Sequence, residues 1–307
     1  MTSSAREILE RYQIRKSKKQ KTAFIQFVTE FAQEHGYPLQ IEKGNGGRNI
    51  VVGDPETAKV VYTAHYDTCA VMPFPNFITP KSIGLYVLYQ LLIVVGFLVV
   101  AFGIGFGFGA LAAVTGIPAE LASVVASAAY WVLLILLIAG PANKHTVNDN
   151  TSGVITLMEI MAALPQEQRD MAAFVFFDLE EVGLFGSAAF ASKHKKAMQQ
   201  KLLINFDCVS DGETVLFVLK KGAAAYGERL EQAFPSNENV RVEVASKGVI
   251  YPSDQANFPV GVGVAALKTS KSGILYMDRI HTKRDTVCRE ENIEFLRDGA
   301  VRLLSMI

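Results

Sequence analysis

A long run without charged side chains limits what this chain can fold into. None of the 38 residues from Ser82 to Ala119 is charged, and after Glu120 a further 23 uncharged residues extend from Leu121 to Asn143. An α-helix needs about 20 apolar residues to cross the hydrocarbon core of a bilayer. The run is therefore long enough for two membrane crossings, which we predict at residues 83–109 and 121–140.

The two predicted helices carry small residues at helical spacing, so they can pack closely as a hairpin. Glycines occupy alternate positions from Gly103 to Gly109, Ala122 and Ala126 lie four residues apart, and Gly116 marks the connecting turn. Small residues four apart let membrane helices approach each other. Such a surface could also bring two copies together as a homo-oligomer. The glycines resemble a dinucleotide-binding fingerprint, but no strand precedes them, so we reject that interpretation.

The residues that flank the uncharged run predict its orientation. Lys81 and Lys144 bracket the run, whereas the connecting turn holds no Lys or Arg. Since positive charge accumulates on the cytoplasmic side, we expect an integral membrane protein with both termini and its main domain in the cytoplasm. Residues 1–20 lack the apolar centre of a signal peptide. Three widely spaced cysteines suit a reducing compartment: Cys69, Cys208 and Cys288.

The overall charge excludes one class of partner, and one basic segment is open to two interpretations. The chain has 30 basic and 30 acidic side chains, which argues against a nucleic-acid partner because nucleic-acid binders normally carry a cationic excess. Residues 11–21 nevertheless hold six basic side chains and no acidic one. This segment is either the solvated face of a helix or a contact with anionic lipid headgroups beside the membrane.

Outside the uncharged run, strand-like and helix-like patterns alternate. Apolar runs typical of buried strands occur at residues 50–52, 59–64, 173–177, 202–206 and 214–219. Helical periodicity occurs at residues 21–35, 152–164, 187–200, 223–234 and 290–306. This alternation predicts an α/β fold with a mostly parallel twisted sheet and helices on both faces. We expect residues 1–82 and 141–307 to form one catalytic α/β domain and residues 83–140 to be an inserted transmembrane helical hairpin.

Acidic residues and a histidine follow three of the predicted strands at the point where each strand ends. The strand at 59–64 is followed by His65 and Asp67, the strand at 173–177 by Asp178 to Glu181, and the strand at 202–206 by Asp207. Ligands of open parallel sheets bind at the carboxyl ends of the strands. These side chains are therefore expected to meet at one edge of the sheet.

Several carboxylates at one edge repel each other unless a cation neutralises them. Histidine together with Asp and Glu is the donor set of a catalytic zinc site. Asp149 in the loop before the helix at 152–164, and His281 in a late loop, could complete the set. Two histidines and several carboxylates exceed the needs of one ion, and two ions that share a bridging carboxylate would use them all.

The order of these residues resembles the co-catalytic zinc aminopeptidases of metallopeptidase family 28. The resemblance covers residues 50–290 once the hairpin is excised. Its motifs are His65-x-Asp67, Asp149-Asn150-x-Ser152-Gly153, Glu180-Glu181, Asp207 and His281-Thr282. It implies a fold of the zinc aminopeptidase/phosphorylase-hydrolase type.

The resemblance also implies a cofactor and a role for each residue. Two Zn²⁺ ions are expected, although Co²⁺ or Mn²⁺ could take their place. One ion would bind His65 and Asp207 and the other Glu181 and His281, with Asp149 as the bridge. Asp67 would orient His65, and Glu180 would be the general base. The peptide bond after the bridging Asp is often cis in the family, so the bond between Asp149 and Asn150 is a candidate for a cis peptide bond.

These roles predict a zinc-dependent hydrolase: a membrane-anchored metallo-aminopeptidase that removes N-terminal residues from peptides. One alternative is a glutaminyl-cyclase-like acyltransferase with a single zinc. Such cyclases typically carry an insertion after the paired glutamates and a Trp beside the last histidine, whereas here Glu180-Glu181 continues without insertion and Ile280 precedes His281. A deacylase or carboxypeptidase using the same metals, and a non-catalytic membrane receptor or scaffold, are further alternatives.

Some positions have no settled role in this interpretation. Asp149 follows His65 by 84 residues (149 − 65), where relatives have a short loop, so the hairpin should emerge close to the site. Ser253-Asp254 resembles a family loop near the metals, and Asp285 either caps the last helix or supports His281. His194 lies among lysines, and we expect it on a solvated helix.

Overall fold

A nine-stranded sheet forms the centre of the structure, a computed structural model that describes residues 1–118 and 120–307. Its strand order is β1-β2-β4-β3-β5-β8-β6-β7, and β9 pairs with β8. The strands are β1 (Leu39–Gly44), β2 (Gly47–Val52), β3 (Val60–His65), β4 (Ala172–Phe177), β5 (Leu202–Phe206), β6 (Thr214–Leu219), β7 (Arg241–Ala245), β8 (Gly261–Thr269) and β9 (Leu275–Tyr276).

The middle of the sheet is parallel and its edges are antiparallel. Strands β4, β3, β5 and β8 run parallel to one another, while β1 and β2 form an antiparallel hairpin that joins β4. On the other side, β6 pairs antiparallel with β8 and parallel with β7. The predicted α/β fold is therefore confirmed, and its parallel part contains the three strands whose ends carry the candidate site.

Side chains alternate between two apolar layers along each central strand. Phe174 and Phe176 of β4 pack in the larger core beneath α5 and α8, whereas Val175 and Phe177 pack on the opposite face against Phe190 of α6. This alternation follows from the two-residue period of a strand. Because both faces are covered, the central strands contain almost only apolar residues.

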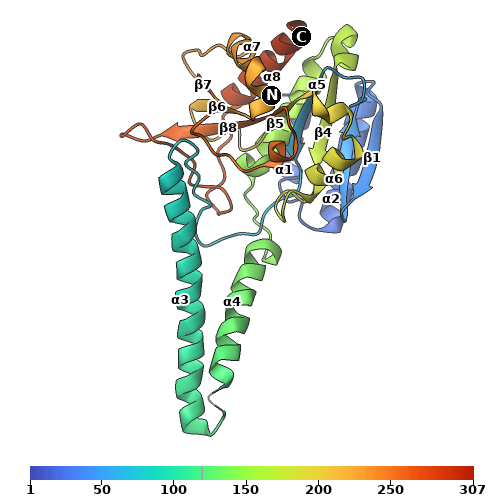
Figure 1. Cartoon of the computed structure of the whole chain (residues 1–307). Helices are drawn as coiled ribbons and strands as arrows, with labels where there is room; N and C mark the ends of the chain where they lie inside the picture. The colour runs from blue at the N-terminus through green and yellow to red at the C-terminus, as the bar shows by residue number, and fades with distance from the viewer. Residues whose placement is uncertain (119) are drawn as a thin grey trace.

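Helices cover both faces of the sheet, and the two longest helices project away from it (Figure 1). The helices are α1 (Ser3–Arg11), α2 (Lys18–Glu34), α3 (Ile83–Thr115), α4 (Leu121–Ala139), α5 (Gly153–Ala163), α6 (Phe185–Lys193), α7 (Gly227–Ala233) and α8 (Glu290–Ser305). Helix α1, which periodicity did not predict, buries Ala5 and Ile8 in the larger core. Helix α6 ends earlier than the predicted residue 200.

The expectation of a solvated His194 was wrong. Its side chain is buried, with Nδ1 2.6 Å from Glu56 Oε1 and Nε2 3.1 Å from Glu42 Oε1. Helix α6 ends at Lys193 and places the following imidazole against the edge hairpin of the sheet. The neighbouring lysines remain exposed, which is why the local sequence looked like a solvated face.

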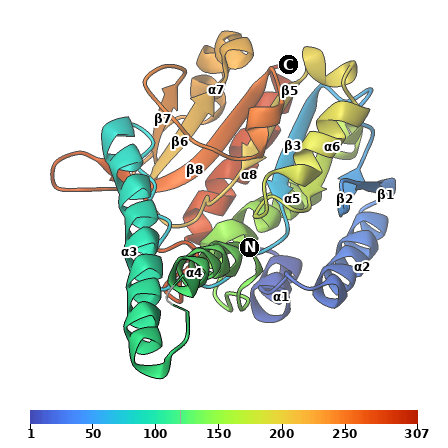
Figure 2. The ribbon, with the colours of Figure 1, turned by 60° about the horizontal axis from the view of Figure 1, so that its bottom comes forward.

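Helices α3 and α4 pack against each other and leave the sheet together (Figure 2). Gly105 approaches Ala126 so closely that an added Cβ would lie 2.6 Å from the alanine Cβ, whereas Gly103 has nothing within 4 Å. Gly105 and Gly109, four residues apart, thus face the partner helix as expected, whereas Gly103 and Gly107 do not. At 1.5 Å per residue, α3 is about 50 Å long and α4 about 28 Å.

These two helices are long and apolar enough to cross a membrane. Their large side chains are exposed rather than packed in a core, and Phe106 and Val114 are 82% and 84% exposed. An ordinary core helix of a soluble protein would be mostly buried. Exposed apolar patches of this size mark an interaction surface for a membrane or another protein.

The close approach of α6 to the end of β4 leads to a test of the fold. A Cβ on Gly186 would lie 2.0 Å from the Asp178 carbonyl oxygen and 2.7 Å from Asn49 Oδ1. We expect Gly186→Ala to lower the free energy of unfolding by about 1–3 kcal/mol, because neither neighbour can move without disturbing β4. Chemical unfolding in detergent measures the change. Gly227→Ala is the control, since its nearest neighbour would be 3.8 Å away; equal losses in both variants would contradict the argument.

Candidate metal centre

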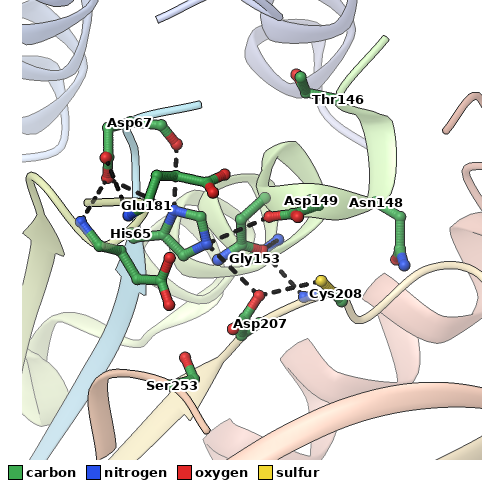
Figure 3. A network of polar contacts seen from close by, with 12 residues as sticks. His65, Asp67, Thr146, Asn148, Asp149, Gly153, Glu181, Asp207, Cys208 and Ser253 are labelled. Atoms are coloured by element: carbon green, nitrogen blue, oxygen red, sulfur yellow. Dashed lines mark hydrogen bonds and ion pairs between the residues drawn. The ribbon is translucent and has the colours of Figure 1, made fainter. Parts of the chain in front are cut away.

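The parallel strands bring the predicted residues together at their carboxyl ends (Figure 3). His65 is the last residue of β3 and lies beside Phe177 of β4, and Thr63 lies beside Asn205 of β5. The residues that follow β4 and β5 therefore begin next to His65. Three strand ends converge because adjacent parallel strands end at the same edge of the sheet.

Asp149 lies between the two histidines. Its Oδ1 is 3.4 Å from His65 Nε2, and its Oδ2 is 3.0 Å from His281 Nε2. Asp207 Oδ1 is 3.5 Å from His65 Nε2 on one side, and Glu181 Oε2 is 3.4 Å from His281 Nε2 on the other. Each oxygen of Asp149 thus faces its own His–carboxylate pair.

The donor atoms suit divalent cations. One atom from each of Asp149, Glu181 and His281 lies within 4.8 Å of the others, and Cys69 belongs to the same group. Atoms of His65, Glu180 and Asp207 form a second such group. Glu181 Oε1 is buried and has no hydrogen-bond partner among the described residues. A buried carboxylate oxygen without a partner is costly, and a bound cation would remove that cost.

The loop that carries Asp149 is held on several sides. Asp285 accepts hydrogen bonds from the backbone N–H groups of Asn148 and Asp149 at 2.7 and 3.0 Å. The Asn150 side chain donates to the Phe206 carbonyl at 2.9 Å and accepts from the Cys208 N–H at 3.2 Å. The Asp149–Asn150 peptide bond is cis, as the resemblance implied. The Asp285 carboxylate thus supports the loop of Asp149, where the sequence had left a cap of the last helix or support of His281 as alternatives; helix α8 begins after Arg289.

Asp67 contacts the residues after β4 as well as His65, which is the only partner that the sequence suggested. His65 Nδ1 lies 3.1 Å from the Asp67 backbone carbonyl and 3.6 Å from its carboxylate Oδ1. The Asp67 carboxylate also accepts hydrogen bonds from the backbone N–H groups of Glu180 and Glu181, at 3.0 and 3.3 Å. It thus joins the ends of β3 and β4 at the site.

Backbone conformations are unusual around the donors. Leu179, Leu184, Cys208 and His281 have positive φ angles of 59°, 59°, 57° and 63°. Leu179 and Cys208 are next to donor residues, His281 is itself a donor, and Leu184 follows Glu181 by three residues. Non-glycine residues adopt this region at a cost and are concentrated at functional sites.

Burial and mutual charge shift the pKa of the acidic groups. Burial raises the pKa of Glu180 well above its usual range; His65 opposes this shift, and Glu181 and Asp207 add to it. Burial also opposes ionisation of Asp149, but hydrogen bonds from His281 and His65 lower its pKa. The surroundings of Asp149 therefore favour its ionised form, whereas those of Glu180 favour the protonated form.

Arg15, which the sequence did not mark as part of the site, lies fully buried behind it. Its Nε donates to the Tyr66 carbonyl at 2.5 Å and its Nη1 to Thr151 Oγ1 at 3.1 Å, while the Arg15 backbone N–H donates to Thr68 Oγ1 at 3.0 Å. Burial lowers its pKa to about 10, and Asp67 and Asp149 oppose that shift. The guanidinium joins the His65 and Asp149 loops and balances part of their negative charge.

The loop that carries Ser253 and Asp254 contacts the strands of the site. Ser253 Oγ accepts a hydrogen bond from Asn205 Nδ2 at 2.9 Å, and Asn205 in turn accepts one from Thr63 at 2.8 Å. Burial raises the pKa of the adjacent Asp254 to about 7. The expected proximity of Ser253-Asp254 to the metal-site strands is therefore present.

The site opens into a cavity of about 290 Å³. Besides the donors, its lining is apolar or neutral and includes Asn76, Ile78, Leu184, Tyr251 and Ile280. The segment between β3 and α3 supplies Asn76 and Ile78, and its backbone binds the His281 loop: Met72 N–H donates to the His281 carbonyl at 2.7 Å. The path into α3 thus forms one wall of the cavity.

An α/β sheet with His, Asp and Glu side chains at the ends of its parallel strands offers the donor set of a catalytic zinc site. The family model described as Peptidase family M28 matches residues 135–298, more than half of the 307-residue chain. The chain therefore belongs to peptidase family M28. No curated protein matches the sequence significantly.

Solved structures of two kinds share the fold. The LapA aminopeptidase of Legionella pneumophila is 14% identical with a TM-score of 0.56, and the match covers 98% of this chain and 69% of LapA. A glutaminyl cyclase of Bacteroides thetaiotaomicron is 13% identical with a TM-score of 0.59, covering 98% and 96%. The glutaminyl cyclase of Fimbriiglobus ruber is 12% identical with a TM-score of 0.54, covering 99% and 94%. These likenesses establish the fold.

The position of Arg15 gives a prediction about the stability of the site. Arg15→Met would leave the Tyr66 carbonyl and Thr151 hydroxyl without their donor and remove a buried positive charge. We expect the free energy of unfolding to fall by about 3 kcal/mol or more, as when one partner of a buried charged network is removed.

Arg169→Met is the matched control for this measurement. Arg169 is half-buried, donates to the His35 carbonyl at 2.5 Å and stacks on Tyr37, away from the candidate site. Its loss should cost about 1–2 kcal/mol. Chemical unfolding of the metal-free proteins compares the two, and a loss at Arg15 no larger than that at Arg169 would show that the site does not depend on this charge.

Proposed function

We propose that this protein is a membrane-anchored aminopeptidase that works with two divalent metal ions. Asp149 would bridge the ions, with His65 and Asp207 completing one set of ligands and Glu181 and His281 the other. The observation that carries the proposal is the placement of Asp149, whose two oxygens face the two histidines at 3.4 and 3.0 Å. A single ion would leave one of the two His–carboxylate pairs unused.

Within this proposal, the residues of the chain position the reactants and move protons. Bound divalent ions would polarise the substrate carbonyl and make a water more acidic. Glu180 accepts the proton from the attacking water and passes it to the leaving amine. Burial raises the pKa of Glu180 above its usual range, which makes its carboxylate a better acceptor for the proton of the attacking water.

The cavity lining favours an aminopeptidase over a carboxypeptidase. None of the residues that line the cavity is Lys or Arg, so no positive side chain on this wall would bind the α-carboxylate of a C-terminal residue. The acidic groups are instead suited to the positive α-amine of an N-terminal residue. Ile78, Leu184 and Ile280 would surround an apolar side chain of that residue.

A glutaminyl cyclase activity is the second candidate, because two solved cyclases share the fold. The absence of a Trp beside His281 and the uninterrupted run after Glu181 favour the peptidase. A non-catalytic receptor is less well supported, since His65, Asp149, Glu180, Glu181, Asp207 and His281 are all present and face one another.

Substitution of the proposed base tests the function. Glu180→Gln removes the proton acceptor and retains the size of the side chain, so we expect turnover of aminoacyl amides to fall by about 100-fold or more. Metal content should stay unchanged, because Glu180 supplies the base and the other residues hold the ions.

Glu181→Gln is the paired control, which should lose metal as well as activity. A panel of aminoacyl amides, N-blocked peptides and N-terminal Gln peptides, with metal analysis on each sample, gives both readouts. Turnover of N-terminal Gln peptides alone would favour the cyclase, and loss of metal from Glu180→Gln would exchange the roles of the two glutamates.

We further propose that α3 and α4 cross the membrane and hold the cavity close to its cytoplasmic surface. Lys16 Nζ donates to the Ile138 carbonyl at the end of α4 at 2.6 Å, and Lys18, Lys19 and Lys144 are exposed on the same end of the domain. Such lysines suit anionic headgroups. Peptides with apolar residues, which partition near that surface, would be the favoured substrates.

Removal of the membrane segment tests this placement. Residues 91–137 would be replaced by a Gly/Ser linker, which keeps Tyr89, whose hydroxyl donates to the Pro75 carbonyl at 2.6 Å, and Ile138. We expect activity on small soluble amides to persist and the advantage on apolar peptides in liposomes to disappear. A second variant with an unrelated apolar hairpin should restore the advantage. If the trimmed enzyme has the same ratio of the two activities as the full chain, the hairpin is only an anchor.

A further inference from the structure

Cys69 lies inside one of the donor groups, although its wide spacing from the other cysteines indicated only a reducing compartment. It follows β3 by four residues, is 1% exposed, and has its sulfur within 4.8 Å of donor atoms of Asp149, Glu181 and His281. Its backbone is fixed, because the Asn143 N–H donates to the Cys69 carbonyl at 3.1 Å and Ala70 forms a β-bridge with Ala142. The segments that lead to α3 and return from α4 thus hold this sulfur at the site.

A second observation indicates that this donor group needs a cation. Glu181 is 8% exposed at its side chain, and its Oε1 has no hydrogen-bond partner among the described residues. The oxygen lies in the same group as the Cys69 sulfur. A cation bound by Glu181 would therefore lie within reach of the thiol as well as of Asp149 and His281.

We propose that the Cys69 sulfur is a fourth protein donor to the ion held by Asp149, Glu181 and His281. The proposal rests on the metal site of the proposed function and adds a ligand that the family resemblance does not supply. On binding, the thiol would release its proton to solvent and form a sulfur–metal bond. A thiolate makes the site softer, so it should favour Zn²⁺ and Cd²⁺ over Mn²⁺ and Mg²⁺.

Cys208 offers a matched control on the other side of Asp149. It is also buried, and its sulfur lies near Asp149 and Asp207. Its thiol, however, donates a hydrogen bond to Asp207 Oδ1 at 3.1 Å. The two cysteines therefore have similar surroundings but different tasks: Cys208 supports a ligand through its hydrogen, whereas Cys69 would bind the ion through its sulfur.

Cobalt spectroscopy on the full-length protein in detergent tests this assignment. The metal-free protein would be loaded with Co²⁺, and a sulfur-to-cobalt charge-transfer band in the near ultraviolet is expected. The band should persist in Cys208→Ser and disappear in Cys69→Ser. The Zn²⁺ affinity of Cys69→Ser should fall by at least the roughly 10–100-fold that loss of a partner behind a ligand costs, because here a direct ligand is removed. Mn²⁺ affinity should change less, because sulfur contributes little to binding a hard ion.

X-ray absorption at the zinc edge gives a second measurement that needs no variant. Zinc-loaded wild-type protein should show a sulfur neighbour at about 2.3 Å. Wild-type protein that binds Co²⁺ without a charge-transfer band, or zinc with only nitrogen and oxygen neighbours, would overturn the assignment of Cys69 and leave the proposed function intact. A band that is lost in Cys208→Ser and kept in Cys69→Ser would also overturn it. Wild-type protein that takes up no metal would instead contradict the proposed function.

Discussion

The contact between Asp149 and the two histidines is the interaction on which the site depends. Several buried carboxylates lie within a few ångströms of one another, and their mutual repulsion would separate the loops that carry them unless opposite charges were present. The imidazoles of His65 and His281 face the two oxygens of Asp149, and Arg15 is buried behind the same loops. Asp67 and Asp285 then bind backbone N–H groups of the other loops. The rest of the framework keeps these like charges in one place, where divalent ions would neutralise them.

The apolar helices are connected to this cluster through residues 66–82 before α3 and residues 140–148 after α4. Four residues after β3 the chain reaches Cys69, and the return from α4 passes Asn143, whose side chain donates to the Thr282 carbonyl at 3.0 Å beside His281. The wall formed by Asn76 and Ile78 belongs to the same connection. A displacement of α3 or α4 would therefore reach the cavity through these side-chain and backbone hydrogen bonds. This is a physical reason to expect that the environment of the helices affects the choice of substrate.

Much of the fold followed from local patterns, and the exceptions have identifiable causes. Near-continuous apolar runs predicted the central strands β3 to β6, but β8 was missed because Gly261 and Gly263 are poor strand formers. Both glycines are needed there, since a Cβ on Gly263 would lie 2.7 Å from the Gln255 side chain. Helix α1 is short, and its packing on α5 gives it a stable position. His194 was misjudged because its lysine neighbours point outward while its own ring packs against the edge hairpin.

The sequence by itself determined the two apolar helices, the α/β pattern and the set of metal-binding residue types, because charge, period and strand-end position are local properties of the chain. Only the tertiary structure decided which atoms face one another. Asp149 faces two histidines, Arg15 is buried behind their loops, and Cys69 approaches Glu181. Each of these contacts involves residues that are far apart in the sequence or that no motif singled out. Such contacts arise from the register of β3 against β4 and β5 and from loops held by several side-chain to backbone hydrogen bonds. No local pattern in the chain encodes distances of this kind.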